Sequence, residues 1–513
     1  MNGAKSLVRT LLASGVDTCF ANPGTSEMHF VAALDQVPGM NCVLGLQENI
    51  VTGMADGYFR IARKPACTLL HCGPGLSNGM ANLHNARRAR SGIVNIVGDQ
   101  ATFHRPFDAA LTADTTAMAR TVSSWVRTST RSADLGRDAA EAVRAARVFP
   151  GQVATLILPA DVSWEEGGMV SAPIATPQPS AIDGGAIEGA ARMLRTESDV
   201  LILLDGPAAL SEAQALAWRV ACATGASLMN SYMAAHVSRG RGRVPVERVP
   251  YAMGKALEAL ERFRHVILVN AEPPVGFFGY PGMPSVQHHP QAQFHVLSRP
   301  DQDPVEALRG LVRALNAPQA AVPDPGPRPE PVRGAPTPEG LAQTLAALMP
   351  DDAIVSDESV SYGRGFYPFT HAAPPHDWLH LVGGAIGAGM PMATGAAIGA
   401  GKQRRVINLQ ADGSAMYTLQ SLWTQARERL PVTTILLNNR KYNILIGEYK
   451  SVGAIPGPTA MSMLDLGDPS LDWVRLANGM GVEAACATTL DECADLMTSS
   501  FGKSAPFLIE LMV

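Results

Sequence analysis

The chain lacks any arrangement of cysteines that would indicate a disulfide framework. Its 513 residues include seven cysteines, and none of them belongs to a Cys-x-x-Cys pair. Secreted scaffolds stapled by disulfides use paired cysteines, so this class is not expected here. Free thiols in a reducing compartment fit better, and we predict a cytoplasmic location.

Runs of basic residues are also missing. Lysine and arginine total 41 against 46 aspartate and glutamate residues, which gives a net charge of −5, and no basic stretch is interleaved with aromatic residues. Nucleic-acid-binding proteins carry such a footprint because they must neutralise phosphates. We therefore expect no nucleic-acid partner.

A single stretch imitates a membrane span. Leu381–Ala400 has 20 residues without a charge, the length that a bilayer crossing requires. It also contains six glycines, Pro391 and few bulky side chains, and no second span accompanies it. A buried loop and helix, in which the backbone approaches a ligand closely, fits better, so no membrane association is expected. Residues 1–15 read as the first helix of a domain rather than as a secretion signal.

Two proline-rich stretches divide the sequence. The first is Ser171–Gly184, and the second, Pro318–Pro338, has eight prolines in 21 residues and predicts an extended, semi-rigid linker. A chain of this length is too long for one hydrophobic core. The predicted parts are a first domain at 1–170, a central domain at 185–316, a linker at 317–338 and a last domain at 339–513.

Apolar β-like runs alternate with helical patterns in all three segments. Continuous apolar strands between helices indicate parallel sheets covered on both faces, so the predicted fold class is α/β. The clearest expected strands are Cys67–His71, Ile93–Val97, Ala154–Leu158, Val200–Leu204, His265–Val269, Ala353–Val355, Val406–Gln410 and Val432–Leu437.

Asp412 and Asn439 stand 27 residues apart in the last segment. The stretch between them predicts a turn at Asp412–Gly413, a helix at about Thr418–Arg429 and a strand that ends just before Asn439. The carboxyl ends of adjacent parallel strands meet at one edge of a sheet, where ligands bind. A carboxylate and an amide oxygen there suit a hard divalent ion that also holds a diphosphate. The alternative is an ordinary βαβ unit with polar turns. Other segments of the sequence must decide between this interpretation and a metal site.

The interval resembles the thiamine diphosphate motif, GDG followed by NN, of the pyruvate oxidase and decarboxylase superfamily. Ala411 departs from this motif, because the family has glycine there. Glu48 opens the string ENIVTGMADGYFRIA, in which a lone acid would ordinarily be a helix-capping charge. The string resembles the family signature around the glutamate that binds the aminopyrimidine ring of the cofactor, with Thr52 and Phe59 as departures.

Two further turns support the resemblance. Gly73–Pro74–Gly75, expected as a turn before a helix, and Asn78 are similar to the family's GPG-x-x-N turn. Asn22–Pro23–Gly24–Thr25 is similar to the loop of its decarboxylase branch. In that branch the histidine at the position of His71 handles protons or the substrate carboxylate. The resemblance therefore implies catalytic roles for Glu48, His71 and Thr25.

The same resemblance implies the cofactors thiamine diphosphate and Mg²⁺ and the residues that hold them. Ile386 matches the apolar wedge that bends the cofactor, and Lys441 is expected to offer its backbone carbonyl to the metal beside Asp412 and Asn439. The remaining implied cofactor contacts are Asn22, Pro23, Gly24, Glu48, Gly73, Pro74, Gly75, Asn78, Val360, Ser361, Gly384, Asp412, Gly413, Ser414, Tyr417, Asn439, Tyr442, Asn443 and Ile444.

The resemblance also implies the architecture. In this superfamily a pyrimidine-binding domain, a middle domain and a diphosphate-binding domain follow one another, each a mostly parallel sheet. The pyrimidine-side acid and the diphosphate site meet across a subunit interface, so a homodimer or homotetramer is expected.

The reaction is the least determined property. The chain resembles benzoylformate decarboxylases and acetolactate synthase-like proteins, but the middle-domain position of the decarboxylase's second histidine falls in a stretch with Phe277 and Phe278. A missing proton donor disfavours protonation and favours transfer of the acyl group from a 2-oxo acid to a carbonyl acceptor. Release of an aldehyde and a catalytically weak cofactor-binding paralogue remain alternatives. The middle segment is short, and FAD is not expected.

Overall fold

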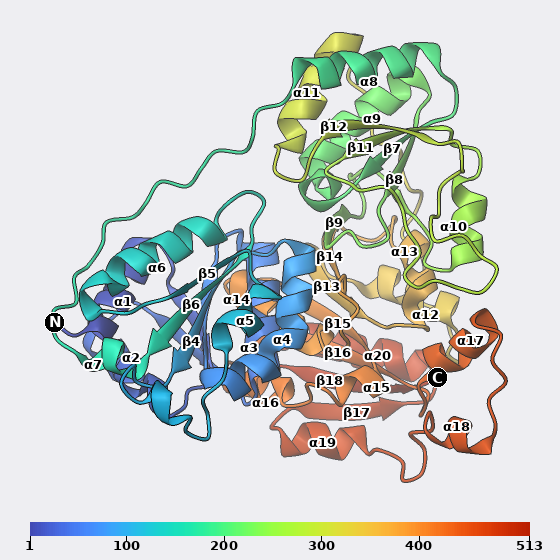
Figure 1. The fold of residues 1–513 in the computed structure, drawn as a ribbon. Helices are drawn as coiled ribbons and strands as arrows, with labels where there is room; N and C mark the ends of the chain where they lie inside the picture. The colour runs from blue at the N-terminus through green and yellow to red at the C-terminus, as the bar shows by residue number, and fades with distance from the viewer.

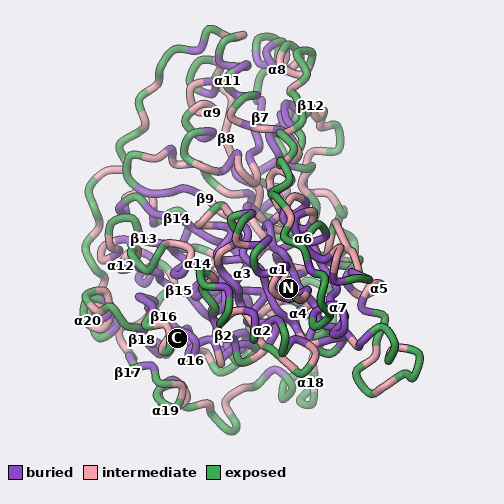
Figure 2. The backbone as a smooth tube through the Cα atoms, turned by 90° about the vertical axis from the view of Figure 1, so that its left-hand side faces the viewer, coloured by how far each residue is buried: buried purple, intermediate pink, exposed green.

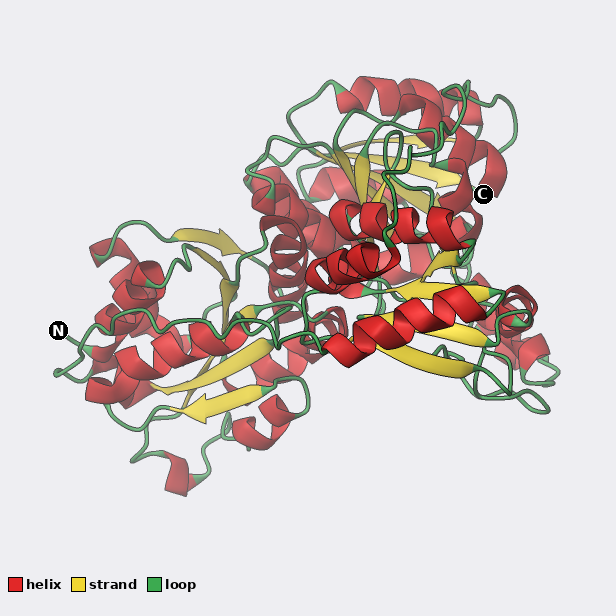
Figure 3. Cartoon of the chain, turned by 90° about the horizontal axis from the view of Figure 1, so that it is seen from above, coloured by secondary structure: helices red, strands yellow, loops and turns green.

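The computed structural model describes residues 1–513 and contains three β-sheets, each covered by helices (Figures 1 and 3). The first sheet is parallel throughout, with the order β2-β1-β3-β4-β6-β5. Its strands are β1 (Thr18–Ala21), β2 (Asn41–Leu44), β3 (Ala66–Leu70), β4 (Ile93–Asp99), β5 (Trp125–Thr128) and β6 (Val153–Pro159). Its helices are α1 (Gly3–Ala13), α2 (Met28–Gln36), α3 (Glu48–Ala62), α4 (Cys72–Ala89), α5 (Thr115–Arg120), α6 (Ser132–Ala146) and α7 (Ala160–Trp164), with short 3₁₀ helices η1 (Thr25–Glu27) and η2 (Arg105–Phe107).

The second sheet has the order β10-β8-β7-β11-β12 and is also parallel. Its strands are β7 (Val200–Leu204), β8 (Ser227–Asn230), β10 (Glu247–Arg248), β11 (His265–Val269) and β12 (Gln293–Ser298). Its helices are α8 (Gly184–Thr196), η3 (Gly206–Ala209), α9 (Ser211–Thr224), α10 (Met253–Leu260) and α11 (Pro304–Leu315). Strands β7 and β11 have the predicted bounds.

The third sheet has the order β17-β18-β16-β15-β13-β14-β9. Its strands are β13 (Ala353–Glu358), β14 (His376–His380), β15 (Val406–Ala411), β16 (Val432–Asn438), β17 (Glu483–Ala487), β18 (Phe507–Met512) and β9 (His236–Arg239). Its helices are α12 (Pro338–Leu348), η4 (Gly363–Gly365), α13 (Phe366–Phe369), α14 (Gly389–Gly399), α15 (Asp412–Ala415), α16 (Ser421–Arg427), α17 (Asn443–Ser451), α18 (Pro458–Ser462), α19 (Trp473–Gly479) and α20 (Leu490–Phe501).

The predicted α/β class with helix-covered parallel sheets is confirmed, with one exception. Strand β9 comes from the central part of the sequence but pairs antiparallel with β14 at the edge of the third sheet. This pairing ties the central part to the last one through backbone hydrogen bonds, and no local pattern in the sequence indicated it.

Three local features differ from the prediction. The helix expected at Thr418–Arg429 begins only at Ser421, and a separate short helix, α15, starts at Asp412, where a turn was expected. The Gly73–Pro74–Gly75 segment does not precede its helix but lies inside the first turn of α4. Proline is tolerated there because the N–H groups of the first helical residues have no acceptor within the helix. The N–H that proline lacks therefore costs no hydrogen bond.

The proline-rich connections lie on the surface. Figure 1 shows the chain between α7 and α8 running as an extended segment along the outside of the molecule. Residues 317–337 contain no helix or strand. They are held by side chains of the central part, since Trp218 Nε1 donates to the Ala321 carbonyl and Arg219 Nε to the Pro318 carbonyl.

Helices α3 and α14 pack backbone against backbone. A Cβ on Gly57 would overlap the carbonyl oxygen of Met392, and a Cβ on Gly395 would overlap that of Met54. The Gly/Ala-rich stretch was expected to approach a ligand, but Gly395 instead approaches α3. No helix of the structure has the length and apolarity to cross a membrane.

A common core surrounds this crossing. One cluster of 27 buried apolar residues includes side chains of both the first and the third sheet regions, so the two parts share a hydrophobic core. Figure 2 shows buried chain on both sides of α3 and α14. The crossing therefore fixes the first part of the chain against the last.

We predict that Gly395→Ala destabilises the protein, because the added methyl must push α14 away from α3. Overpacking of this kind costs about 1–3 kcal/mol. The measurement is the midpoint of thermal unfolding. The control is Gly254→Ala in α10, where an added Cβ meets nothing within 4 Å; a similar loss in both variants would contradict the packing explanation.

Candidate functional site

Three neighbouring strands of the first sheet end beside one another and are followed by the predicted pyrimidine-side residues. The order β2-β1-β3 places the loop after β1 between the other two. Asn22 follows β1, Glu48 comes soon after β2, and His71 follows β3 directly. The Asn22 side chain donates to the Gly45 carbonyl at 2.9 Å, which joins the first two loops.

Glu48 is the first residue of α3 and is 8% exposed. Its Oε2 accepts a hydrogen bond of 3.0 Å from the Asn78 side chain on α4. Gly75 leaves room for the carboxylate, since a Cβ there would lie 3.1 Å from Glu48 Oε1. The structure thus brings the acid, the GPG segment and Asn78 together, while Pro74 and Asn78 remain exposed to solvent.

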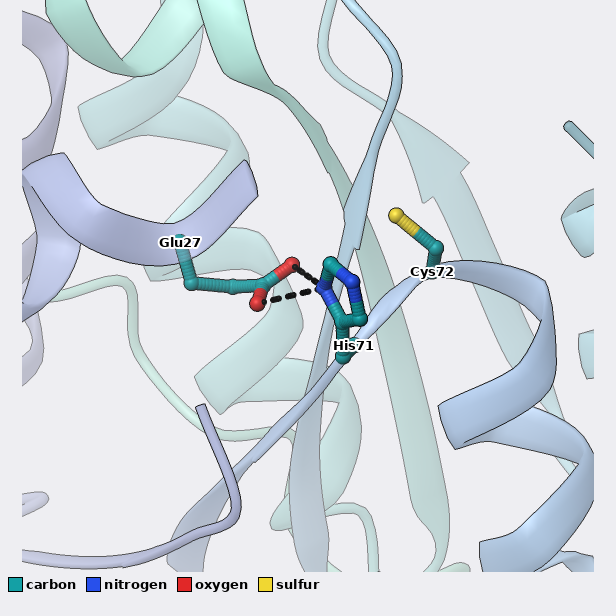
Figure 4. Close-up of side chains that lie close together, drawn as sticks. All are labelled: Glu27, His71 and Cys72. Carbon is teal, nitrogen blue, oxygen red and sulfur yellow. Dashed lines mark hydrogen bonds and ion pairs between the residues drawn. The ribbon is translucent and has the colours of Figure 1, made fainter. Parts of the chain in front are cut away.

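His71 is held by a buried acid that the sequence did not indicate. Glu27 is fully buried, and its Oε2 lies 2.9 Å from His71 Nδ1 (Figure 4). Because a carboxylate only accepts, Nδ1 carries the hydrogen and Nε2 of the neutral ring is left as the proton acceptor. Gly24 allows this arrangement, because a Cβ there would overlap the imidazole.

Ser26 and Cys72 complete this corner of the site. Ser26 Oγ lies 3.2 Å from His71 Nδ1 and 3.0 Å from Cys72 Sγ, and it also donates to Glu27. Burial raises the pKa of the Cys72 thiol to about 11. Thr25, for which a catalytic role was predicted, is exposed at the start of η1. The sequence feature that could have pointed to Glu27 is its place in the loop that begins with Asn22–Pro23–Gly24.

Asp412 and Asn439 lie at the carboxyl edge of the third sheet. Strands β15 and β16 pair in parallel with Ala411 opposite Leu437, so the residues that follow are neighbours. Asp412 Oδ1 accepts from the Gly413 N–H at 2.8 Å, and Oδ2 accepts from the Arg440 N–H at 2.7 Å. Burial raises the pKa of Asp412, while these N–H groups oppose the rise.

The donor set at this edge fits a hard divalent cation. Each Asp412 oxygen, the Asn439 Oδ1 and the Lys441 carbonyl accept one backbone N–H bond and keep a further lone pair. All are oxygen donors, which magnesium prefers. The turn at 440–442 is braced by backbone hydrogen bonds to Leu464 and Leu466.

The neighbouring residues explain two features of the motif. Gly413 is required because a Cβ there would lie 2.5 Å from the Tyr442 ring. Ala411 causes no backbone strain, since its φ of −77° and ψ of 145° are open to any residue. The Ser414 hydroxyl accepts a bond of 2.7 Å from Gln410 Nε2 and is fixed behind the turn. Tyr417 is half exposed beside it.

Glu358 clamps the loop that carries Ile386. Its carboxylate is buried and accepts from the N–H groups of Gly387 (2.7 Å) and Gly389 (2.7 Å) and from Gln410 Nε2 (2.9 Å). A negative charge at the start of α14 is also favoured by the helix dipole. Burial raises the pKa of Glu358, and the hydrogen bonds oppose the rise. No motif of the sequence assigned a role to Glu358.

A cavity of about 200 Å³ lies beside this loop. Four of the predicted cofactor contacts line it: Val360, Gly384, Ile386 and Ile444. Val360 has a φ of +50°, which is strained for a β-branched residue and typical of functional sites. Phe277 and Phe278 from the central part form another wall, and the Phe277 ring packs against Gly384.

A histidine of β14, His380, also lines this cavity but is uncharged near pH 7. Its ring lies 3.0 Å from the Arg248 guanidinium. Burial, together with Arg248 and Arg239, holds the pKa of His380 well below its usual range. The ring is therefore neutral near pH 7 and cannot act as an imidazolium proton donor.

The two halves of the site touch within the chain through α4. Asn85 Nδ2 donates to the Ala385 carbonyl at 2.8 Å, and Asn82 Nδ2 donates to the Gly387 carbonyl at 3.4 Å. Helix α4, which carries Asn78, therefore contacts the loop that carries Ile386. The remaining predicted residues, Pro23, Gly73, Ser361, Asn443 and Tyr442, lie in the loops and helix starts at the two sheet edges.

The chain is similar to known proteins along its length. Residues 1–118 match the family described as thiamine pyrophosphate enzyme, N-terminal TPP binding domain, and residues 361–511 match its C-terminal TPP binding domain. The chain is 46% identical to the "Putative acetolactate synthase large subunit IlvX" of Mycobacterium tuberculosis, with 100% of this chain and 99% of the relative covered. It is 28% identical to the benzoylformate decarboxylase of Pseudomonas aeruginosa, over 97% and 96% of the two chains.

A solved structure is similar over the same extent. The thiamine diphosphate-dependent 4-hydroxybenzoylformate decarboxylase of Rhodococcus jostii RHA1 superposes with a TM-score of 0.84 at 25% identity, covering 99% of this chain and 98% of that one.

We predict that Glu358→Gln weakens binding of the expected cofactor, thiamine diphosphate. An amide can accept at only one atom, so an N–H of Gly387 or Gly389 loses its partner, at a cost of about 1–3 kcal/mol. Affinity should fall about tenfold or more when binding is followed by titration calorimetry. The exposed Glu261→Gln serves as the control, and unchanged affinity in Glu358→Gln would rule out the clamp.

Proposed function

Since the chain belongs to the thiamine pyrophosphate enzyme family, in the group of acetolactate synthases and benzoylformate decarboxylases, we propose that it decarboxylates a 2-oxo acid and transfers the remaining acyl group to a carbonyl acceptor. The cofactor, when bound, supplies the nucleophilic carbon and takes up the electrons that CO₂ leaves behind. The metal is proposed to be Mg²⁺, held by Asp412, Asn439 and the Lys441 carbonyl.

The protein's own residues have separate tasks in this proposal. Glu48 would hold a proton at the pyrimidine ring, steadied by the 3.0 Å bond from Asn78. Ile386 would set the bend of the cofactor, and Glu358 would keep its loop rigid through the N–H groups it binds. His71 would accept and return protons at Nε2, because Glu27 holds Nδ1.

The cavity wall beside Ile386 bears on the choice between acyl transfer and release of an aldehyde. Phe277 and Phe278 offer no proton donor there, and His380 is neutral. With little proton supply on that wall, a carbonyl acceptor competes better for the reactive carbon than a proton does. This supports acyl transfer over release of an aldehyde.

Aldehyde release, as in benzoylformate decarboxylase, is the second candidate. The Glu27–His71 pair favours it, because an oriented histidine is an efficient proton donor once it has been charged. The third alternative, a catalytically weak paralogue, rests on Ala411 and on the missing second histidine; the unstrained backbone of Ala411 supports an active protein instead.

The reaction is tested by product analysis. The holoenzyme with thiamine diphosphate and Mg²⁺ is incubated with single 2-oxo acids, each with and without an aldehyde acceptor, and the products are identified by mass spectrometry. We expect coupled hydroxyketone or hydroxy acid products. Aldehyde and CO₂ alone from every substrate would establish the second candidate instead, and absence of any turnover would favour the third.

We further propose that active sites form between subunits of a homodimer or homotetramer, with Glu48 of one subunit facing Asp412 of another. In support, Pro74 and Asn78 beside Glu48 are exposed in the single chain. The apolar side chains of Leu445, Ile455 and Met463 near the metal edge are exposed too. A second subunit packed on this side would cover these apolar side chains.

The subunit arrangement is tested by mixing two inactive variants. Glu48→Gln and Asp412→Asn should each abolish turnover alone, and Glu48→Gln should still bind thiamine diphosphate. Coexpression should restore about a quarter of wild-type activity, because half of the random dimers then hold one intact site out of two. Coexpressed variants that remain inactive despite forming mixed dimers would place both halves of the site in one subunit.

A further inference from the structure

Glu27, His71 and Cys72 form a compact cluster of three different donor types. One carboxylate oxygen, one imidazole nitrogen and the Sγ atom all lie within 4.8 Å of one another. Figure 4 shows Glu27 and Cys72 approaching His71 from opposite sides. Glu27 belongs to η1 and Cys72 opens α4, so the cluster joins the ends of two neighbouring strands.

The donor set is selective for one class of metal ion. A thiolate, an imidazole and a carboxylate together suit Zn²⁺ and similar borderline ions, which accept sulfur and nitrogen ligands. Magnesium prefers oxygen alone, and the oxygen-only set at Asp412 and Asn439 suits it. The ligand atoms therefore favour a different ion at each site: a zinc-like ion at Glu27, His71 and Cys72, and magnesium at Asp412 and Asn439.

The dimensions also suit a zinc-sized ion. Bonds of about 2.0–2.3 Å in a tetrahedron place ligand atoms about 3.3–3.8 Å apart. Donors within 4.8 Å of one another need to shift relative to one another by at most about 1.5 Å to reach that separation. Ser26 Oγ lies 3.0 Å from Cys72 Sγ, where it can bond a water in the fourth position.

The backbone supports the placement of the thiol. Cys72 has a φ of +52°, which is unfavourable for a residue with a side chain. Such strain persists only where the surroundings hold it and is frequent at binding sites. Glu27 is buried without any cationic partner besides His71, so its charge is available to a metal ion.

We propose that Glu27, His71 and Cys72 form a binding site for Zn²⁺ or a similar divalent ion, and that its occupation inhibits the enzyme. On binding, the Cys72 thiol loses its proton to solvent and bonds the metal as a thiolate. The metal takes the Nδ1 lone pair of His71, and the ring hydrogen moves from Nδ1 to Nε2. Nε2 then no longer accepts protons; this inhibitory role rests on the proposed function.

Cobalt provides a test of binding that does not depend on turnover. CoCl₂ is titrated into tag-free holoenzyme, and the near-ultraviolet thiolate-to-cobalt charge-transfer band is recorded, with stoichiometry from equilibrium dialysis. We expect one Co²⁺ per chain with a thiolate band, and Zn²⁺ should abolish the band by competition. A protein without the band, or with binding that Mg²⁺ competes away, would refute the site.

Variants assign the band to the cluster. Cys72→Ser should remove the band, and Glu27→Gln should weaken binding by more than about tenfold, as even partners outside the metal shell contribute that much. The control is Cys42→Ser, an exposed cysteine on β2 outside the cluster, which should leave band and activity unchanged. If circular dichroism shows that Cys72→Ser is misfolded, the loss of cobalt affinity in Glu27→Gln decides whether the cluster binds the metal. A charge-transfer band that persists in a folded Cys72→Ser overturns the assignment.

Inhibition is measured separately. In the presence of Mg²⁺, ZnCl₂ should suppress turnover of wild type and Cys42→Ser at concentrations that leave Cys72→Ser at its own rate without zinc. Metal bound at Cys72 with full turnover would refute the inhibitory role. A protein that turns over no 2-oxo acid would refute the proposed function, while the cobalt band would still decide the metal site.

Discussion

The contact between α3 and α14 is the constraint on which the rest of the structure depends. Gly57 and Gly395 let the two helices meet at the level of their backbones, which no side chain at those positions would allow. Helix α3 begins with Glu48, and α14 follows the loop with Ile386. The crossing therefore fixes Glu48 and the loop with Ile386 on one core, built from residues of the first and third sheet regions.

Buried carboxylates organise the site around this core. Glu358 holds the start of α14, Asp412 joins the ends of β15 and β16, and Glu27 orients His71. A buried carboxylate without partners would be costly, and each of these is matched by backbone N–H groups or an imidazole. Their hydrogen bonds hold the loops around Glu48 and His71 in place at the sheet edges.

Much of the scaffold could be predicted from the sequence, because its signals are local. The apolar runs that became β7 and β11 have the bounds expected of buried parallel strands, and the Asp412–Asn439 interval led to adjacent strand ends. Helix boundaries were less predictable. The stretch after Asp412 is interrupted at residues 416–420, since Tyr417 and Thr418 pack against Gly387 rather than continue a helix.

The sequence by itself determined the fold class, the cofactor family and the positions of Glu48, Asp412 and Asn439, because strand periodicity and motif spacing are properties of the chain. Only the tertiary structure decided that Gly395 faces α3, that β9 joins the third sheet, and that Glu27 and Cys72 lie beside His71. These contacts join segments far apart in sequence, and such pairings depend on how whole sheets and helices pack.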